Sequence, residues 1–240
     1  MYHNNLKFNY RRLINKFSKY PIIYSDGFNL QKILNHFKIN FIIDVGAFTG
    51  SYAQSVRRFG YKGKILSFEP ILNSHKILKD NSKNDTNWAV YKNIALGEKK
   101  STKHIFVSGK SDSSSFLKIK KEHLKLEPES KIIKKEKVEV DKLDDIIKNY
   151  KKIDLKKTIL KIDTQGYEFE VLKGSTNILK KVKLLQIELS LTELYEGQKS
   201  HEKIIHLLKK MKFKTWCLIP GFKNKKNGKL LQYDIIMYKS

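Results

Sequence analysis

The chain has 240 residues, long enough for one large α/β domain with a well-buried core. No run of roughly 18 apolar residues is present, so no transmembrane helix is predicted, and the N-terminus lacks an apolar signal-peptide core, which favours a cytoplasmic protein. The single cysteine, Cys217, excludes an internal disulfide and a cysteine-based zinc site, and the seven histidines show no metal-ligand spacing.

The net charge of +25 comes almost entirely from lysine. Only four of the 49 basic residues are arginines. A surface this basic can bind a polyanion such as nucleic acid, an anionic glycan or a membrane surface. Nucleic-acid readers more often carry arginine clusters interleaved with exposed aromatic residues. Since the lysines are spread over most of the chain, we favour a lysine-rich solvated surface.

Two helices are predicted before residue 40. Apolar residues recur at helical spacing from Leu6 to Phe17 and again from Leu30 to Phe37, with Pro21 and Gly27 interrupting between them. We expect residues 1–40 to form a helical extension that serves as a cap or a dimerisation arm, and we favour the cap. Residues 41–240 show no linker and are expected to form one domain.

The first informative motif is a strand followed by a glycine turn. Phe41–Val45 is predicted to be a buried strand, and Ser51–Phe59 a helix. Gly46 and Gly50 allow a tight turn between them, as where open α/β sheets present backbone N–H groups to a ligand. The acid, Asp44, precedes the first glycine and a third glycine is missing, so the dinucleotide fingerprint is not matched. A carboxylate there suits a ligand with a cationic amino group; a purely structural turn is the alternative.

A second acid follows the next predicted strand, Lys64–Phe68. Glu69 stands at its carboxyl end, where an acid about 20 residues past the glycine turn binds ribose hydroxyls in mononucleotide-binding folds. A surface acid in a loop is the alternative. A helix over 73–83 comes next. A third strand over 88–97 would bring Asn93 and Ala95 near the adenine edge.

Residues 108–137 are polar, charged and poor in periodicity, after a small extra strand over 104–107. Long irregular segments in compact domains are often functional lids. We therefore expect this segment to form a lid that covers the bound cofactor, with plain disorder as the alternative. A short strand from Val138 is then expected to lead into an Asp-capped helix ending near Ile147.

The second informative motif surrounds the predicted strand Thr158–Ile162. Lys161 and Asp163 are two residues apart and therefore face the same side of the strand. Both charges cost desolvation energy unless they are paired or used, which favours a functional role for them. Gly166 turns the chain into a helix from Tyr167, and Glu168 in its first turn complements the helix dipole.

The remaining chain completes a sheet. A fifth strand over 182–189 carries Glu188 near its carboxyl end. An amphipathic helix over 201–211 follows, and strands over 213–218 and 232–238 are expected to give the sheet an antiparallel edge.

Seven sequence blocks occur together in one order: DVGAFTGSY at 44–52, FEP at 68–70, NIALG at 93–97, SDSSSF at 111–116, VDKLDDI at 140–146, LKIDTQGYEFEVLKGS at 160–175 and IELS at 187–190. With these blocks the chain resembles the FkbM family of S-adenosylmethionine-dependent methyltransferases from about residue 40 to the end. The resemblance implies a class I methyltransferase fold: a Rossmann-like three-layer sandwich around a seven-stranded, mostly parallel sheet of order 3-2-1-4-5-7-6. It also implies O-methyl transfer to hydroxyls of sugars or secondary metabolites.

Position by position, the resemblance implies a cofactor site. The residues lining the methionine moiety would be Asp44, Gly46, Ala47 and Gly50. Glu69 would hold the ribose. The residues around the adenosine would be Asn93, Ala95, Asp112 and Ser113. Many family members have KIDVEG where this chain has KIDTQG at 161–166, so Gln165 is given no catalytic role.

For the chemistry, we expect Asp163 to act as base or acceptor-orienting group. Lys161 would lower its pKa or stabilise a developing alkoxide, and Glu188 is the second candidate. Together with Glu168, the acids Asp163 and Glu188 could also bind a divalent cation.

The expected acceptor is a sugar, a glycan or a small metabolite. Two rival functions stay open. One is an RNA 2′-O-methyltransferase, favoured by the charge and by a Lys–Asp–Glu set on strand edges. The other is a non-catalytic module that binds an anionic polymer. A nicotinamide enzyme is least favoured, for want of the third glycine.

Overall fold

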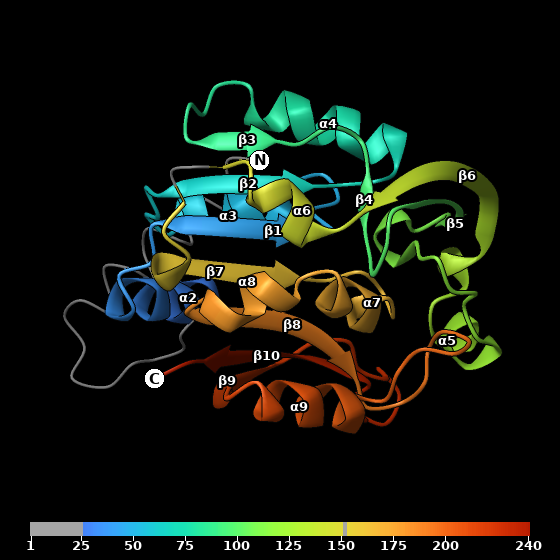
Figure 1. Ribbon diagram of the computed structural model, residues 1–240. Helices are drawn as coiled ribbons and strands as arrows, with labels where there is room; N and C mark the ends of the chain where they lie inside the picture. The colour runs from blue at the N-terminus through green and yellow to red at the C-terminus, as the bar shows by residue number, and fades with distance from the viewer. Residues whose placement is uncertain (1–25, 151–152) are drawn as a thin grey trace.

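The computed structural model describes residues 26–150 and 153–240. Its centre is a seven-stranded sheet of order β3-β2-β1-β7-β8-β10-β9 (Figure 1). The strands are β1 (Phe41–Val45), β2 (Lys64–Phe68), β3 (Trp88–Val90), β7 (Thr158–Ile162), β8 (Leu184–Ser190), β9 (Lys214–Pro220) and β10 (Gln232–Tyr238). The first five strands in this order are parallel, and β10 runs antiparallel to both its neighbours. Counted along the chain, this is the predicted order 3-2-1-4-5-7-6.

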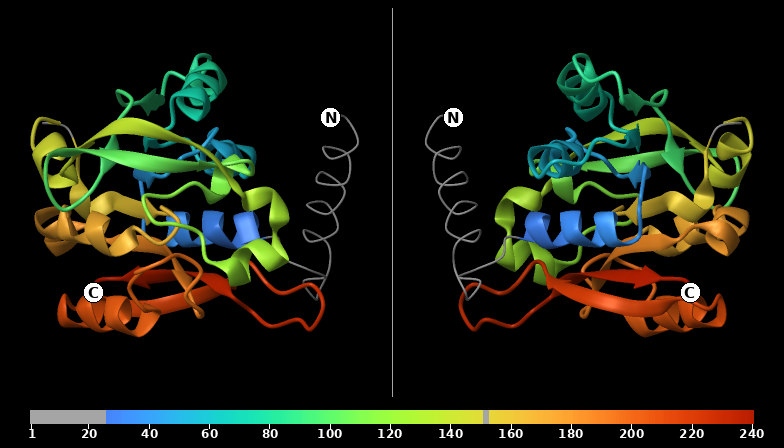
Figure 2. Two further views of the ribbon diagram at one scale, coloured as in Figure 1. Left: turned by 90° about the vertical axis from the view of Figure 1, so that its right-hand side faces the viewer. Right: turned by 90° about the vertical axis from the view of Figure 1, so that its left-hand side faces the viewer.

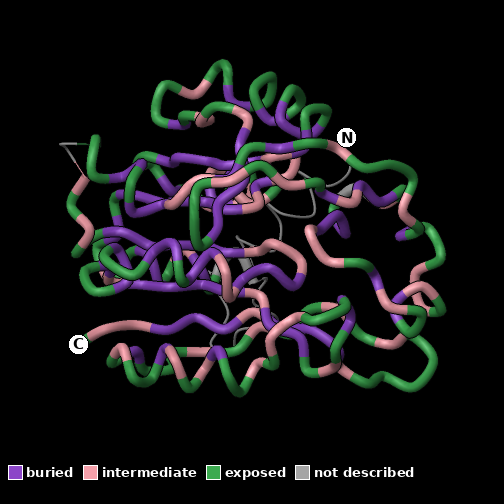
Figure 3. The backbone as a smooth tube through the Cα atoms, turned by 45° about the vertical axis from the view of Figure 1, so that its right-hand side comes forward, coloured by how far each residue is buried: buried purple, intermediate pink, exposed green. Residues whose placement is uncertain are grey.

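Helices cover both faces of this sheet and make a three-layer sandwich. One face packs against α2 (Asp26–His36), α3 (Ser51–Arg58) and α4 (Leu72–Ser82). The other packs against α6 (Leu143–Ile147), α7 (Glu168–Lys173), α8 (Thr176–Lys181) and α9 (His201–Lys210). Since successive strand residues point to opposite faces, Ile42 joins the first core and Ile43 the second. The central strands are almost entirely buried (Figure 3).

The predicted N-terminal extension is described only in part, because residues 1–25 lie outside the described residues. Its second predicted helix is confirmed as α2, whose Leu30, Ile33 and Leu34 pack with Ile42 of β1. No described residue of α2 lines the cavity discussed below. The domain boundary at residue 40 stays a prediction. Among the described residues, no helix has both the length and the apolar character that a bilayer span needs.

A second, three-stranded sheet of order β4-β6-β5 lies beyond the carboxyl ends of β1 and β2 (Figure 1). Its strands are β4 (Ala95–Leu96), β5 (Ser101–Ser108) and β6 (Ile132–Asp141). The prediction of one strand over 88–97 is therefore wrong. The chain leaves the first sheet after Val90, where the side-chain amide of Asn93 donates to the carbonyls of Glu69 and Pro70. The prediction failed because an apolar run in the sequence indicates buried strand residues but does not indicate which of two sheets they join.

The segment predicted to be irregular is folded. It contains the 3₁₀ turns η1 (Ser111–Ser113) and η2 (Pro128–Ser130) and the helix α5 (Lys121–Leu126), and β6 begins at Ile132 rather than at Val138. Exposed lysines along β6 hide its alternation, although this strand pairs with β5 over almost its full length. Leu124 and Leu126 of α5 pack in a small core around Tyr195.

The helix that was predicted to be capped by an aspartate has no such cap in the structure. A third 3₁₀ turn, η3 (Leu155–Lys157), precedes β7, and α6 begins at Leu143 without a side-chain cap. The side-chain carboxylate of Asp141 accepts a hydrogen bond from the adjacent Lys142 N–H and does not cap the helix. The capping aspartate is Asp144, which accepts from the N–H groups of Asn177 and Ile178 in α8. Asp144 of α6 therefore caps α8 rather than its own helix. The two helices are neighbours in space, although the sequence gives no sign of it.

Candidate active site

A cavity of about 470 Å³ opens at the carboxyl ends of the parallel strands. This is the edge at which open α/β sheets bind ligands, and the volume lies in the range of roughly 300–1,000 Å³ of small-molecule sites. The turn after β1, the ends of β2 and β7, and residues 112–116 form much of its wall. Of the predicted site residues, those lining it are Gly46, Ala47, Glu69, Ala95, Asp112, Ser113, Lys161, Asp163 and Glu188.

The turn after β1 packs closely between the ends of β2 and β7. Gly46 has φ +76°, and a Cβ built on it would lie 1.8 Å from the backbone oxygen of Asp163. The N–H groups of Gly46 and Ala47 donate to Phe68 O at 3.1 and 3.0 Å. Gly50 does not line the cavity; a Cβ there would meet the Trp88 ring at 2.6 Å. The glycines therefore shape the turn by allowing close packing.

Asp44 lies beneath this turn, fully buried and outside the cavity wall. Ser67 Oγ donates to its Oδ2 at 3.3 Å, whereas Oδ1 has no hydrogen-bond partner. Lys161 Nζ lies 3.5 Å from Oδ1. Burial raises the pKa of Asp44, and Lys161 opposes that rise.

Lys161 stands opposite Asp44 on the neighbouring strand β7. Its Nζ lies 3.3 Å from Asp163 Oδ2 and 3.4 Å from Gly46 O. Burial by itself would lower the pKa of Lys161, but the carboxylates of Asp163 and Asp44 raise it above its ordinary value. The ammonium group is therefore charged at neutral pH, and the same-face Lys–Asp pair expected on β7 is present.

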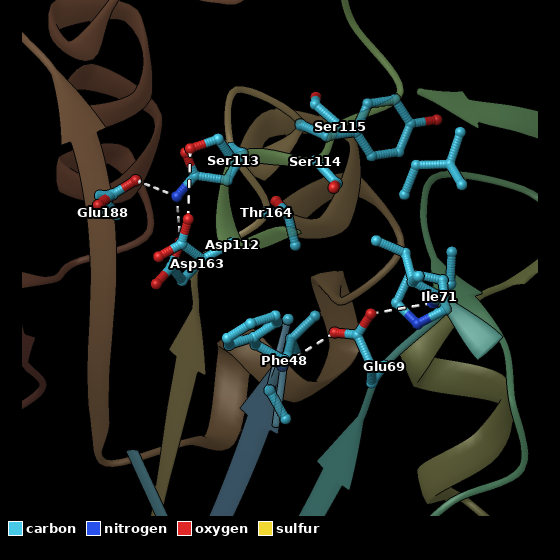
Figure 4. A pocket seen from close by; sticks show the side chains of 18 of the residues that line it. Phe48, Glu69, Ile71, Asp112, Ser113, Ser114, Ser115, Asp163, Thr164 and Glu188 are labelled. Carbon is cyan, nitrogen blue, oxygen red and sulfur yellow. Dashed lines mark hydrogen bonds between the residues drawn. The ribbon is translucent and has the colours of Figure 1, made fainter. Parts of the chain in front are cut away.

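Glu69 at the end of β2 holds the neighbouring loops. Its Oε2 accepts from Phe48 N–H and its Oε1 from Ile71 N–H, both at 2.9 Å (Figure 4). Burial raises the pKa of Glu69 to about 8, and the two N–H groups limit the rise. Figure 4 shows Glu69 on one side of the cavity, with Asp163 and Glu188 on the other.

Three of the four residues expected near the adenosine line the cavity, and one does not. Ala95, Asp112 and Ser113 are on the wall. Asn93 lies behind it and binds backbone carbonyls at the end of β2, as described above.

Gln165 links two acids on the side of the cavity opposite Glu69. Its Nε2 donates to Asp163 Oδ1 at 2.8 Å and to Glu188 Oε2 at 2.9 Å, and its Oε1 accepts from Tyr195 Oη at 2.7 Å. Gln232 also donates to Glu188 Oε2. Burial and the nearby Asp163 raise the pKa of Glu188 well above its ordinary value. The sequence signal for this contact was Gln165 itself, a neutral amide donor two residues after Asp163, which was given no role.

The three acids considered for a divalent cation do not gather around one point. Glu168 Oε1 accepts instead from Thr164 N–H, Thr164 Oγ1 and Gly166 N–H, which fixes the turn after β7. Within residues 26–150 and 153–240, no group of three or more His, Cys, Asp or Glu side chains is arranged to hold a metal ion.

Sequence reasoning missed the part of the cavity formed around α5. Here the wall includes Lys110, His123 and Glu127 and, from the last hairpin, Phe222 and Gln232. Lys110, His123 and Glu127 were missed because residues 108–137 were expected to be irregular, and Phe222 and Gln232 because they meet this segment only in the folded chain. Figure 2 shows α5 beside the loop between β9 and β10, which brings the two segments together.

The model of the FkbM methyltransferase domain matches residues 44–215. The chain belongs to this family. The FkbM protein described here is an S-adenosylmethionine-dependent methyltransferase with a class I, Rossmann-like fold. No curated protein matches its sequence.

Solved structures similar to this FkbM protein include other methyltransferases. Precorrin-6y C5,15-methyltransferase from Geobacter metallireducens is 12% identical, with a TM-score of 0.46 and 93% of each chain covered. An S-adenosylmethionine-dependent methyltransferase from Aquifex aeolicus is 13% identical, with a TM-score of 0.43 and 90% of each chain covered. Aeropyrum pernix fibrillarin with bound S-adenosylmethionine is 8% identical, with a TM-score of 0.45, 82% of this chain covered and 66% of that one.

The cavity of the FkbM protein fits this cofactor chemically. A sulfonium nucleotide with an amino group is attracted to carboxylates, and Asp112 and Asp163 both line the wall. Oδ1 of Asp44, in the strand that precedes the Gly46 turn, has no hydrogen-bond partner and forms an ion pair with Lys161.

Proposed function

We propose that the protein transfers the methyl group of S-adenosylmethionine to a hydroxyl oxygen of a sugar, a glycan or a small metabolite. The observation that carries this proposal is the Lys161–Asp163 pair. It stands at the cavity wall beside the Gly46 turn, where a carboxylate and an ammonium group can act on one acceptor oxygen.

For the cofactor, we assign the methionine end to Gly46 and Ala47, with the buried Asp44 beneath and Gly50 shaping the turn. Glu69 would accept from the ribose hydroxyls. The adenosine would contact Ala95, Asp112 and Ser113, with Asn93 acting indirectly by holding the end of β2. The cofactor supplies an already activated methyl group, so the protein has to align the acceptor and take its proton.

Asp163 is the proposed base or acceptor-orienting group. Gln165 holds Oδ1 and Lys161 faces Oδ2, so the carboxylate is fixed in place. Lys161 would stabilise negative charge on the acceptor oxygen. Glu188 remains the second candidate; its raised pKa favours the protonated form, which can donate a hydrogen bond to the acceptor.

The charge of the cavity wall supports a neutral acceptor. Among the described residues, five carboxyl groups and two ammonium groups line it: Glu69, Asp112, Glu127, Asp163 and Glu188 against Lys110 and Lys161. Burial favours the protonated forms of Glu69 and Glu188, so the remaining carboxylates and the two ammonium groups nearly balance. The wall therefore offers phosphate groups no excess of positive charge, although the whole chain carries +25. Two observations favour the alternative, an RNA 2′-O-methyltransferase: the net charge, and the set of Lys161, Asp163 and Glu188 at the strand ends.

The deciding experiment is incubation with S-adenosylmethionine labelled in its methyl group, against separate pools of sugars, lipid-linked glycans, small metabolites and RNA. We expect label in a sugar, glycan or metabolite pool. Label confined to RNA would support the alternative. Absence of cofactor binding by calorimetry would indicate a non-catalytic polyanion-binding module.

The catalytic assignment predicts that Asp163→Asn lowers turnover by roughly a hundredfold or more, the contribution typical of a positioned base. Affinity for S-adenosylhomocysteine, measured by calorimetry, should stay close to wild type. Asp145→Asn on the exposed side of α6 is the matched control and should leave both unchanged. Full turnover by Asp163→Asn would refute the assignment.

A further inference from the structure

A buried imidazole on the cavity wall has no hydrogen-bond partner. His123 of α5 is only 2% exposed and lines the cavity, and neither of its ring nitrogens is hydrogen-bonded. Nε2 lies 3.6 Å from Glu127 Oε2, beyond hydrogen-bonding distance. Buried polar groups in native proteins almost always have a partner, so this exception requires an explanation.

Packing against neighbouring rings does not explain why a histidine is buried at this position. The ring of His123 stands perpendicular to that of Tyr195 and tilted against that of Phe222, with centroids 5.5 Å apart in both pairs. A phenylalanine would make the same aromatic contacts without burying two unpaired nitrogens. The imidazole therefore suits a partner that enters the cavity.

Burial keeps the ring of His123 neutral. Burial lowers the pKa of His123, and the positive charge of Lys110 lowers it further, whereas Glu127 and Asp112 act in the opposite direction. Lys110 Nζ donates to Glu127 Oε1 at 2.7 Å, which offsets the attraction of that carboxylate for a proton on the ring. A neutral imidazole offers one hydrogen-bond donor and one acceptor.

We propose that His123 is an acceptor-binding residue, whose neutral ring exchanges hydrogen bonds with hydroxyl groups of a sugar or similar polyol. This inference rests on the proposed transfer to a hydroxyl compound. A hydroxyl group both donates and accepts, as the neutral ring does. The neighbouring Phe222, which also lines the cavity, adds apolar surface of the kind that packs against the C–H groups of a sugar ring.

The position of His123 agrees with this role. Tyr195, which packs against its ring, donates through Oη to Gln165, and Gln165 donates to Asp163. The imidazole therefore belongs to the wall that continues to the proposed base. A small movement would let Nε2–H donate to Glu127, the residue one helical turn later, and leave Nδ1 as the acceptor.

The first test uses His123→Phe, which fills the same space. We expect an unchanged affinity for S-adenosylhomocysteine by calorimetry and an equal or higher midpoint of thermal unfolding. The rate of label transfer into the sugar pool at low acceptor concentration should fall by roughly tenfold or more, the loss expected for a missing buried hydrogen bond. His123→Gln, which keeps one donor and one acceptor, should recover part of this loss.

The second test does not depend on turnover. In the ¹⁵N spectrum of wild-type protein loaded with S-adenosylhomocysteine, the ring nitrogens of His123 should shift when methyl α-D-glucopyranoside is added. Those of His75, which bonds to Tyr91 O away from the cavity, should not shift and provide the internal control.

The outcomes separate the two proposals. If the wild type labels sugars and His123→Phe does so equally well, or if the His123 signals do not respond, the role of His123 is refuted while the proposed function stands. If the wild type labels RNA alone, both fail, because the acceptor is then a polyanion.

Discussion

At the scale of single residues, burial raises the pKa of carboxyl groups that line the cavity, and Glu69 is the example with the clearest consequence. Glu69 is held by two backbone N–H groups in the free protein, and burial raises its pKa to about 8 from an ordinary value near 4.5. The folded state therefore keeps a proton that the unfolded chain has already released at neutral pH. Its contribution to stability is complete below about pH 4.5 and is lost as the pH rises through 8.

The variant Glu69→Gln should remove this loss, since an amide does not titrate. Between about pH 5 and 8 the free energy of unfolding of the wild type should fall relative to the variant, by up to about 1.4 kcal/mol per pH unit. Urea unfolding over a pH series measures the difference. Parallel curves for the two proteins would contradict a raised pKa at this position.

The same variant tests the ribose assignment at a fixed pH. At about pH 9, where Glu69 is ionised, losing the carboxylate should weaken binding of S-adenosylhomocysteine by roughly tenfold or more, because a hydrogen bond to a charged group contributes about 1.5–3 kcal/mol. Unchanged affinity by calorimetry would mean that another group holds the ribose.

At the scale of elements, the site depends on how closely β1 approaches β7. The Gly46 turn leaves no room for a side chain, whereas Gly60, with φ +100°, has no atom within 4 Å of a built Cβ. The two glycines thus share a left-handed backbone conformation but differ in their surroundings.

This contrast predicts the effects of Gly46→Ala and Gly60→Ala. The Gly60 variant should lose roughly 1–2 kcal/mol from left-handed backbone strain alone. The Gly46 variant should lose a further 1–3 kcal/mol or so, because its methyl group displaces the end of β7. Urea unfolding measures both, and equal losses would show that the turn is not packed as described.

Asp144 connects two helices that are separate along the chain. It lies in the first turn of α6 and accepts three hydrogen bonds from the start of α8, at Thr176 Oγ1, Asn177 N–H and Ile178 N–H. A carboxylate at a helix N-terminus satisfies free N–H groups and complements the helix dipole.

Replacing Asp144 by alanine should therefore cost about 1–2 kcal/mol of stability, the loss of a typical N-cap. Asp145→Ala is the matched control: Asp145 is exposed and pairs only with Lys148, so its loss should change stability by less than about 0.5 kcal/mol. Thermal or urea unfolding distinguishes the two variants. A control as damaging as the test variant would argue against the cap.

At the scale of the whole molecule, a chain of charge +25 surrounds a cavity wall rich in carboxyl groups. The surface and the cavity therefore favour different ligands. The lysines attract polyanions over a distance set by salt screening, while the proposed ligands of the cavity are a cationic cofactor and a neutral acceptor.

We expect a fluorescent random-sequence RNA to bind at low salt and to be released as salt rises. Affinity by anisotropy should fall more than roughly tenfold between 50 and 200 mM salt, since binding depends on counterion release. S-adenosylhomocysteine should not compete with it. Competition would place RNA in the cavity and favour the alternative function.

Much of the main sheet could be predicted because its signals are local. The apolar runs ending at Val45, Phe68 and Ile162 mark buried strands, and each is followed by an acid or a glycine at the sheet edge. The pairing of Lys161 with Asp163 also follows from strand periodicity alone. The break between Val90 and Ala95 was not predictable, because it depends on Asn93 reaching carbonyls on another strand.

By itself, the amino-acid sequence determined the parallel sheet, the glycine turn, the acids at the strand ends and membership of the FkbM family, because each depends on residues close together in the chain. Only the tertiary structure decided that Gly50 packs on Trp88, that Asp144 caps α8, and that α5 brings His123 to the cavity. Those contacts join segments far apart in the chain, and the lysines between them carry no periodicity that would reveal which segments meet.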